Sequence, residues 1–152
     1  KPFLKGVPIV YSKRMIEMKI GKFGEGGLDD WPGFFKEAGE KMGENYHLFR
    51  PEGGESMQDC YDRARMFYLY LLKKHSFKER ILLVGHGFFS MHLILDALGL
   101  DLFELRYYHL NNASISTLDI DKGGKVKDFH INDYHHLIYE GMKMKGLRVT
   151  RD

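Results

Sequence analysis

The sequence lacks several features that would assign a protein to a class at once. It contains one cysteine, Cys60, so no disulfide can form within the chain. No apolar run approaches the roughly 20 residues that a membrane-spanning helix needs, and residues 1–6 do not resemble a signal peptide. These absences exclude a disulfide scaffold and predict a cytoplasmic protein with no membrane partner.

Motifs of several common enzyme classes are also missing. Neither a P-loop nor a dinucleotide-binding fingerprint occurs, and the glycine-rich stretch 24–27 fits neither spacing. A strand followed by His-Gly suggests the oxyanion loop of an α/β-hydrolase, but that class needs a Gly-x-Ser-x-Gly nucleophile motif. No such motif is present, and Ser56 in Gly-Glu-Ser-Met-Gln lacks the second glycine. The hydrolase alternative is therefore disfavoured.

An excess of charge of one sign is missing as well. The 152 residues carry 23 basic and 21 acidic side chains, which gives a formal net charge of +2. This balance favours neither a nucleic acid nor an anionic surface as a partner, so any anion site must be local. With 43% hydrophobic and 29% charged residues, the chain has the composition of one globular domain.

The sequence does contain clear local patterns. Residues 34–42 predict a short helix, and a long amphipathic helix begins after Ser56, which is placed to form a capping box with Asp59. The continuous apolar run at 81–84 predicts a strand buried on both faces. A helix over 88–98 follows, closed by glycine. This order of helix, buried strand and helix is typical of a layered α/β fold.

The two ends of the chain have weaker patterns. Residues 7–11 are β-branched and contain Pro8, which favours an edge strand or an extended lead-in. Alternation over 114–120 and 126–131 predicts a β-hairpin. The basic tail from Tyr139 onward indicates a short helix or a loosely ordered end.

The strongest chemical motif is Val84-Gly85-His86-Gly87, which places a histidine between the predicted strand and the following helix. Ligands of open α/β sheets bind at the carboxyl ends of strands, and helix N-termini bind anions. The flanking glycines allow a ligand to approach the backbone closely. His86 is therefore a candidate phosphate-binding residue. The alternative is that it only caps or packs against a turn.

Further motifs accompany His86 in a characteristic order. Glu17 precedes a glycine-rich loop, Gly54-Glu55-Ser56 opens the helix that contains Arg63, and Asn112-Ala113-Ser114-Ile115 opens a strand. Together with the string around His86, these motifs resemble those of the histidine phosphatase superfamily, which includes cofactor-dependent phosphoglycerate mutases and small phosphatases. The resemblance covers roughly residues 7–137.

The resemblance implies a three-layer α/β sandwich with a mostly parallel central sheet, and phosphoryl transfer through a phosphohistidine. It implies that Glu17 and His86 are catalytic, that His86 and Gly87 bind the phosphate, and that Glu17 is the proton donor and then the base. The implied substrate is a small phosphorylated molecule, with no cofactor and no metal. The sequence does not choose between a phosphatase and a mutase.

One family motif is missing from the sequence. The nucleophile of the family lies in an Arg-His-Gly motif on the first strand, and that motif does not occur here. Residues 1–152 are therefore expected to form a partial domain that is inactive alone, with the nucleophile upstream. A missing N-terminal segment or a homo-oligomer would complete the sheet, whose core edge is otherwise bare. The alternative is a noncatalytic domain that binds phosphate or serves in assembly.

Three remaining groups of residues have structural interpretations. Arg63 and Glu55 are expected to brace the helix end as an ion pair rather than to touch substrate. Cys60 lies on the apolar side of its helix and is expected to be a buried, inert thiol. A metal site is disfavoured, because adjacent residues of a strand point to opposite sides; its candidate ligands are His130, His135 and His136.

Overall fold

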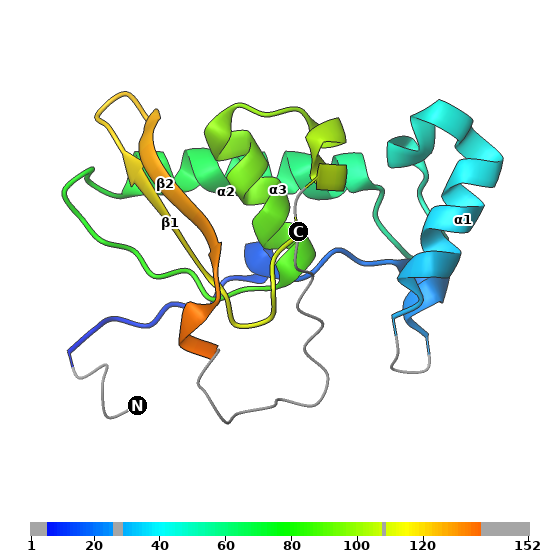
Figure 1. The fold of residues 1–152 in the computed structure, drawn as a ribbon, viewed down its shortest axis with the longest axis horizontal. Helices are drawn as coiled ribbons and strands as arrows, with labels where there is room; N and C mark the ends of the chain where they lie inside the picture. The colour runs from blue at the N-terminus through cyan, green and yellow to red at the C-terminus, as the bar shows by residue number, and fades with distance from the viewer. Residues whose placement is uncertain (1–5, 26–28, 108, 138–152) are drawn as a thin grey trace.

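The computed structural model describes residues 6–25, 29–107 and 109–137. In these ranges the chain combines helices with a β-hairpin, as an α/β class predicts. The regular elements are α1 (Trp31–Met42), α2 (Met57–Lys74), α3 (Gly87–Leu98), β1 (Ile115–Ile120) and β2 (Val126–Asp133). In Figure 1 the hairpin and α1 lie at opposite ends of the molecule, with α2 and α3 between them.

The predicted capping box sets the start of α2. The Ser56 hydroxyl accepts a hydrogen bond from the Asp59 N–H at 3.1 Å, and the Asp59 carboxylate accepts one from the Ser56 N–H at 2.8 Å. Two N–H groups that have no partner within the helix are thereby satisfied. Lys73 and Lys74 place positive charge at the other end, where the helix dipole is negative. The helix predicted after Ser56 is confirmed.

Helix α3 is apolar on most of its surface and packs against α2. Gly99 ends it in the left-handed conformation, with φ 68°, which glycine adopts without a steric penalty. The helix predicted at 88–98 is thus confirmed with one more residue at its start. The short helix predicted at 34–42 is also confirmed, and it begins earlier because Asp30 caps it by accepting a hydrogen bond from the Gly33 N–H at 2.9 Å.

The predicted hairpin forms, with β1 and β2 antiparallel and Leu118 opposite Phe129. Its turn is held by the Asp121 carboxylate, which accepts hydrogen bonds from the N–H groups of Gly123 and Lys125. The Tyr68 hydroxyl of α2 donates to the Gly124 carbonyl at 3.0 Å. The hairpin is therefore tied to the helix pair and not only to itself.

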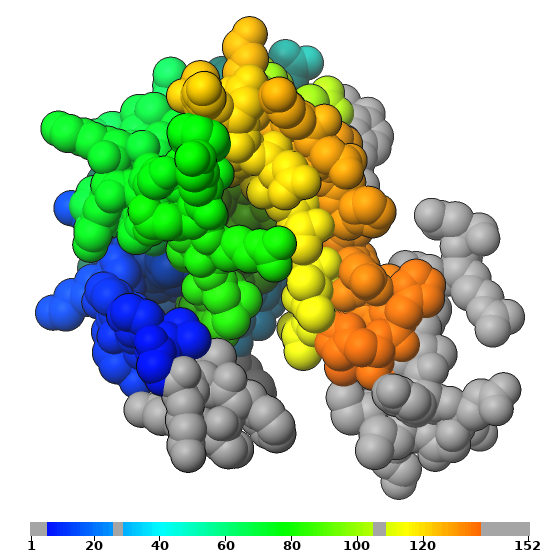
Figure 2. All heavy atoms as spheres, turned by 90° about the vertical axis from the view of Figure 1, so that its left-hand side faces the viewer, coloured from blue at the N-terminus to red at the C-terminus, as the bar shows by residue number. Residues whose placement is uncertain are grey.

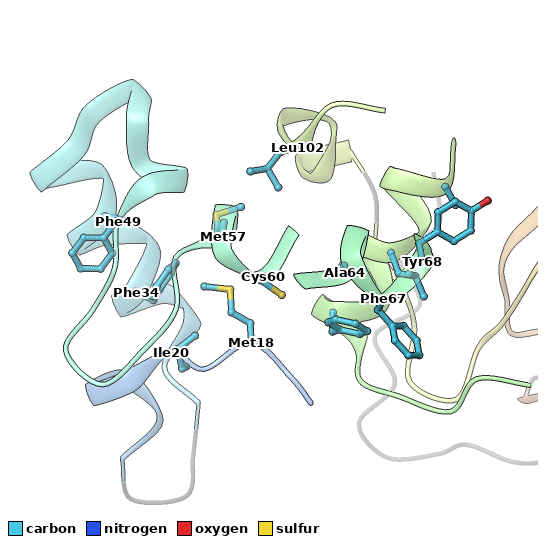
Figure 3. Close-up of a cluster of buried hydrophobic side chains, with 14 residues drawn as sticks. Met18, Ile20, Phe34, Phe49, Met57, Cys60, Ala64, Phe67, Tyr68 and Leu102 are labelled. Atoms are coloured by element: carbon cyan, nitrogen blue, oxygen red, sulfur yellow. The ribbon is translucent and has the colours of Figure 1, made fainter. Parts of the chain in front are cut away.

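One hydrophobic core connects the helices to the segment before α1. Figure 3 shows it as a row of side chains from Phe34 and Phe49, through Met18 and Cys60, to Ala64 and Phe67. Phe34, Cys60 and Ala64 are fully buried. Because α2 contributes to the whole row, it is the element against which the other parts of the chain are positioned.

The predicted buried strand at 81–84 is not formed. Residues 79–86 have no regular secondary structure, and Leu82 and Val84 are 75% and 82% exposed. In Figure 2 the green segment after α2 lies on the surface between the blue N-terminal residues and the yellow and orange hairpin. A strand needs a neighbour with which to exchange backbone hydrogen bonds. The described part of the chain supplies none for this segment.

The prediction of a three-layer sandwich with a mostly parallel central sheet is therefore not met by residues 6–25, 29–107 and 109–137. Their one sheet is the antiparallel pair β1–β2. Residues 7–11 are an extended lead-in with exposed side chains, the second of the two structures predicted for them. The prediction for the tail from Tyr139 onward lies outside the described residues. No helix in the described ranges combines the length and the apolar character needed to span a lipid bilayer.

Candidate functional site

Residues 16–20 have no regular secondary structure and carry Glu17 along the edge of the core. Met18 and Ile20 are both 3% exposed and belong to the core, whereas Ile16 is 39% exposed. The segment is thus held to the core on either side of Glu17, whose carboxylate reaches the start of α3.

The Glu17 carboxylate binds the first turn of α3. Its Oε2 accepts a hydrogen bond from the Phe88 N–H at 3.0 Å, and its Oε1 accepts bonds from the Phe89 N–H at 2.8 Å and the Met18 N–H at 2.9 Å. The first N–H groups of a helix have no partner within it, and the helix dipole favours negative charge there. The anion at the start of α3 is thus a carboxylate of the chain itself.

Arg63 of α2 holds the segment that carries Glu17. Its Nη1 donates to the carbonyls of Arg14 and Ile16 at 2.9 and 2.8 Å. Its Nε and Nη2 donate to the two carboxylate oxygens of Glu55, both at 2.9 Å. The predicted ion pair between Glu55 and Arg63 is therefore confirmed.

His86 is the N-cap residue of α3, with an extended backbone, and the residue is exposed. Its carbonyl accepts a hydrogen bond from the Ser90 N–H at 3.0 Å, whereas its side chain makes no cap hydrogen bond. The binding of phosphate by this side chain stays a prediction.

The glycines on either side of His86 differ in their surroundings. A Cβ added at Gly87 would meet no atom within 4 Å, so open space lies beside this backbone. A Cβ added at Gly85 would lie 3.2 Å from the Met15 Cε, so Gly85 allows close packing instead. Glu17 is thus bound to the two residues that follow His86-Gly87, at a turn that is open beside Gly87.

An open pocket of about 380 Å³ adjoins Glu17. Lys19 and Gly21 line it together with the glycine-rich loop, and Gly53 lines it from the loop before α2. At Gly21, with φ +54°, an added Cβ would collide with the Glu52 carbonyl oxygen, so only glycine allows the two loops to pack here. This pocket is wide open, and neither His86 nor Gly87 lines it.

Cys60 is fully buried, as predicted. Burial raises the pKa of its thiol to about 12, because desolvation disfavours the thiolate, and the charge of Arg63 only partly offsets this effect. A thiol with so high a pKa is not a nucleophile near neutral pH. The prediction of an inert thiol is confirmed.

Sequence reasoning missed an aromatic contact beside the site. The Trp31 ring stacks on the Phe88 ring, with centroids 4.7 Å apart, and Phe88 is the residue whose N–H binds Glu17. The sequence contains a signal, a Trp-Pro-Gly-Phe-Phe cluster that starts a helix after the glycine-rich loop. Nothing local indicates that its tryptophan packs against a residue 57 positions away (from 31 to 88).

Comparison with protein families identifies the family of the chain. The model of the histidine phosphatase superfamily (branch 1) matches residues 2–133. No curated protein sequence shows a significant match to the chain.

Proposed function

Because the chain belongs to the histidine phosphatase superfamily, branch 1, we propose that it forms the phosphate-binding and proton-transfer part of an enzyme acting on small phosphomonoesters. The observation that carries the proposal is that the Glu17 carboxylate binds the N–H groups of Phe88 and Phe89, the two residues that directly follow His86-Gly87 in the chain. A proton donor and phosphate-binding groups must lie within a few ångströms of one another around the same phosphorus.

The proposed reaction has two steps. A nucleophilic histidine nitrogen attacks phosphorus, the P–O bond to the leaving group breaks, and Glu17 in its acid form gives its proton to the leaving oxygen. Water then attacks the phosphohistidine, the Glu17 carboxylate takes a proton from that water, and the P–N bond breaks. In a mutase, a second hydroxyl group takes the place of water. Neither step needs a metal or another cofactor.

Glu17 has one oxygen suited to the proton transfer. Its Oε1 accepts two N–H groups, so both of its lone pairs are used, whereas within the described part of the chain Oε2 accepts only the Phe88 N–H. The proton therefore travels on Oε2. The His86 ring and the Gly87 N–H bind the phosphoryl oxygens on the open side of the turn.

The nucleophile comes from a segment outside these 152 residues, which also completes the sheet. The segment adds a parallel strand beside residues 81–84, and the three-layer sandwich follows from this addition. Support comes from the exposed side chains of Leu82 and Val84 on an extended backbone that ends at His86. An exposed apolar segment of this kind can pair with a strand of another chain, so a second copy of the protein is the other source of the strand.

The test is the hydrolysis of p-nitrophenyl phosphate by the full-length protein encoded by the gene. His86→Ala is expected to lower kcat/KM by about 100- to 1000-fold, because a donor that stabilises the charge of the transition state is removed. Rapid quenching in base with labelled substrate should trap a phosphoenzyme whose label is then lost on acidification, as expected for a P–N bond. Product analysis separates the two acceptors, since a phosphatase releases phosphate and a mutase moves it to another hydroxyl.

His130→Ala is the matched control, because His130 is exposed on β2 and lies outside the site. Its activity should equal that of the wild type. Equal activity of the His86→Ala variant would make the site assignment wrong, and a phosphohistidine formed by residues 1–152 alone would make the upstream nucleophile wrong. Absence of any phosphotransfer by the full-length protein would favour the noncatalytic alternative.

A further inference from the structure

We infer that the ion pair of Arg63 and Glu55 is a positioning device that holds Glu17 in place for proton transfer. The chemical consequence rests on the role proposed for Glu17 above, whereas the geometry stands on its own. Neither residue touches the reacting atoms in this account. Both act through the backbone on either side of Glu17.

The guanidinium of Arg63 uses all five of its N–H donors. Two go to the Glu55 carboxylate and two to the carbonyls of Arg14 and Ile16, and the fifth goes to the Cys60 sulfur at 3.6 Å. An arginine has five N–H groups and no acceptor. No donor is left for a phosphate, so Arg63 is excluded from direct substrate binding in this arrangement.

Glu55 binds the same segment at Lys19, two residues after Glu17. Its Oε2 accepts a hydrogen bond from the Lys19 N–H at 3.1 Å, and its own N–H donates to the Lys19 carbonyl at 2.7 Å. The backbone is therefore fixed at Arg14 and Ile16 by Arg63, and at Lys19 by Glu55. Glu17 lies between the fixed points, so its Cα has little freedom to move relative to α2.

Arg63 also contacts the helix that receives Glu17. Its guanidinium lies over the Phe89 ring, 4.7 Å from the centroid, and the Phe89 N–H binds the Glu17 carboxylate. The Arg63 side chain thus contacts both the segment that carries the Glu17 carboxylate and Phe89, whose N–H donates to that carboxylate. A single side chain therefore fixes the position of the carboxylate relative to α3.

The bidentate geometry explains why arginine is required. The side chains of Arg63 and Glu55 are 20% and 21% exposed, so the pair is largely shielded from water. A planar fork binds both carboxylate oxygens while its remaining nitrogen faces two carbonyls. Lysine has three donors on a single nitrogen and cannot reproduce this set of contacts. Arg63→Lys therefore keeps the charge and removes the positioning.

The first test measures position by NMR on the full-length protein. The backbone amide signals of Phe88 and Phe89 report the hydrogen bonds to Glu17. In Arg63→Lys and Glu55→Gln they are expected to move toward their positions in Glu17→Ala. Arg65→Lys is the matched control, because Arg65 lies two residues away on α2, its side chain is 62% exposed, and among the described residues it pairs only with Asp96, at 3.8 Å. Unchanged amide signals in Arg63→Lys would overturn the inference.

The second test measures the consequence for proton transfer. An alkyl phosphate needs a proton donor for its poor leaving group, whereas p-nitrophenyl phosphate hardly does. Arg63→Lys is expected to lower kcat/KM on the alkyl phosphate by about 10- to 100-fold and kcat/KM on p-nitrophenyl phosphate far less, because kcat/KM reports formation of the phosphohistidine and not its hydrolysis, which both substrates share. Glu17→Gln should show the same selectivity, and the double variant Glu17→Gln with Arg63→Lys should show no further selective loss.

The outcomes separate the inference from the proposed function. Equal losses on both substrates in Arg63→Lys, with a selective loss in Glu17→Gln, would mean that Arg63 only stabilises the fold, and the inference would be wrong. Amide signals that move as expected, with Glu17→Gln and His86→Ala both fully active, would support the positioning and refute the proposed function.

Discussion

His92 is a fully buried histidine of α3 with a partner for only one ring nitrogen. Its Nδ1 lies 2.7 Å from the Phe88 carbonyl. A carbonyl only accepts, so Nδ1 carries the hydrogen and donates it. Among the described residues its Nε2 has no hydrogen-bond partner. The neutral ring fits this place, and a protonated ring would bury an unpaired N–H.

Burial lowers the pKa of His92 below its ordinary value of 6.5, and this shift predicts a pH dependence of stability. The Phe88 carbonyl and the charges of Glu17 and Glu55 raise the pKa, and Arg63 lowers it, but desolvation is the largest effect. Below pH 6.5 the unfolded chain binds a proton that the folded chain excludes. The free energy of unfolding is therefore expected to fall with falling pH, by up to about 1.4 kcal/mol per pH unit, until the folded-state pKa is reached.

Urea unfolding followed by circular dichroism between pH 5 and 8 measures this effect. In His92→Gln, whose side chain does not titrate, the slope of the free energy of unfolding below pH 6.5 should be smaller than in the wild type. The matched control is His130→Gln on the exposed surface of β2, which should keep the wild-type slope. An unchanged slope in His92→Gln would show that other groups cause the acid loss of stability.

At the scale of elements, the start of α2 links stability to the site. Ser56 is 4% exposed and caps the helix, and its neighbour Glu55 holds the backbone of Lys19. Fraying of the first turn would release Glu55 together with the cap. The capping box therefore supports the segment that carries Glu17 as well as the helix.

Removing the cap is expected to destabilise both α2 and the segment that carries Glu17. Ser56→Ala should lower the free energy of unfolding by about 0.5–2 kcal/mol, the usual cost of losing a serine cap. Hydrogen exchange of the Lys19 amide should become faster, because its acceptor on Glu55 becomes less ordered. Chemical denaturation and amide exchange measure the two effects.

Ser76→Ala is the control for this prediction, since Ser76 lies exposed after α2 and, in the ranges that the structure describes, its hydroxyl accepts only the Lys78 N–H, at 3.3 Å. Its effect should stay within about 0.5 kcal/mol. If Ser56→Ala lost stability without any change at Lys19, the helix cap and the site segment would be independent.

The accuracy of prediction differed between the helices and the strand at 81–84. The helices and the hairpin were predicted because their caps, periodicity and turn residues act within a few positions of the chain. A buried strand depends on a partner strand, which can be far away in sequence or outside the chain. The apolar run at 81–84 has the composition of a buried strand. In the described residues no partner strand covers it, so its side chains stay exposed.

At the scale of the whole molecule, the exposed run at 81–84 provides a test for the missing strand. In the isolated 152-residue chain, Leu82→Ser and Val84→Ser should change the free energy of unfolding by less than about 0.5 kcal/mol, because both side chains are exposed. In the full-length protein, where the proposed strand covers them, the same changes should each cost about 2–5 kcal/mol. Thermal and urea unfolding of both proteins measure the difference.

Leu95→Ala is the reference for a buried position, since Leu95 is 1% exposed. It should cost about 2–5 kcal/mol in both proteins. Equal and small effects of Leu82→Ser in the two proteins would exclude a covering strand at this face. Large effects in the isolated chain at high protein concentration, lost on dilution, would identify a second copy as the cover.

The sequence by itself determined the α/β character, the ends of α2 and α3, the hairpin, the buried thiol of Cys60 and the family, because these depend on local patterns and on the order of motifs. Only the tertiary structure decided that the Glu17 carboxylate binds the N–H groups of Phe88 and Phe89. The same holds for the hydrogen bonds that all five N–H groups of Arg63 donate within the protein, and for the exposure of residues 81–84. Each of these depends on groups that lie far apart in the sequence or on a partner strand, and the local pattern of residues carries no information about either.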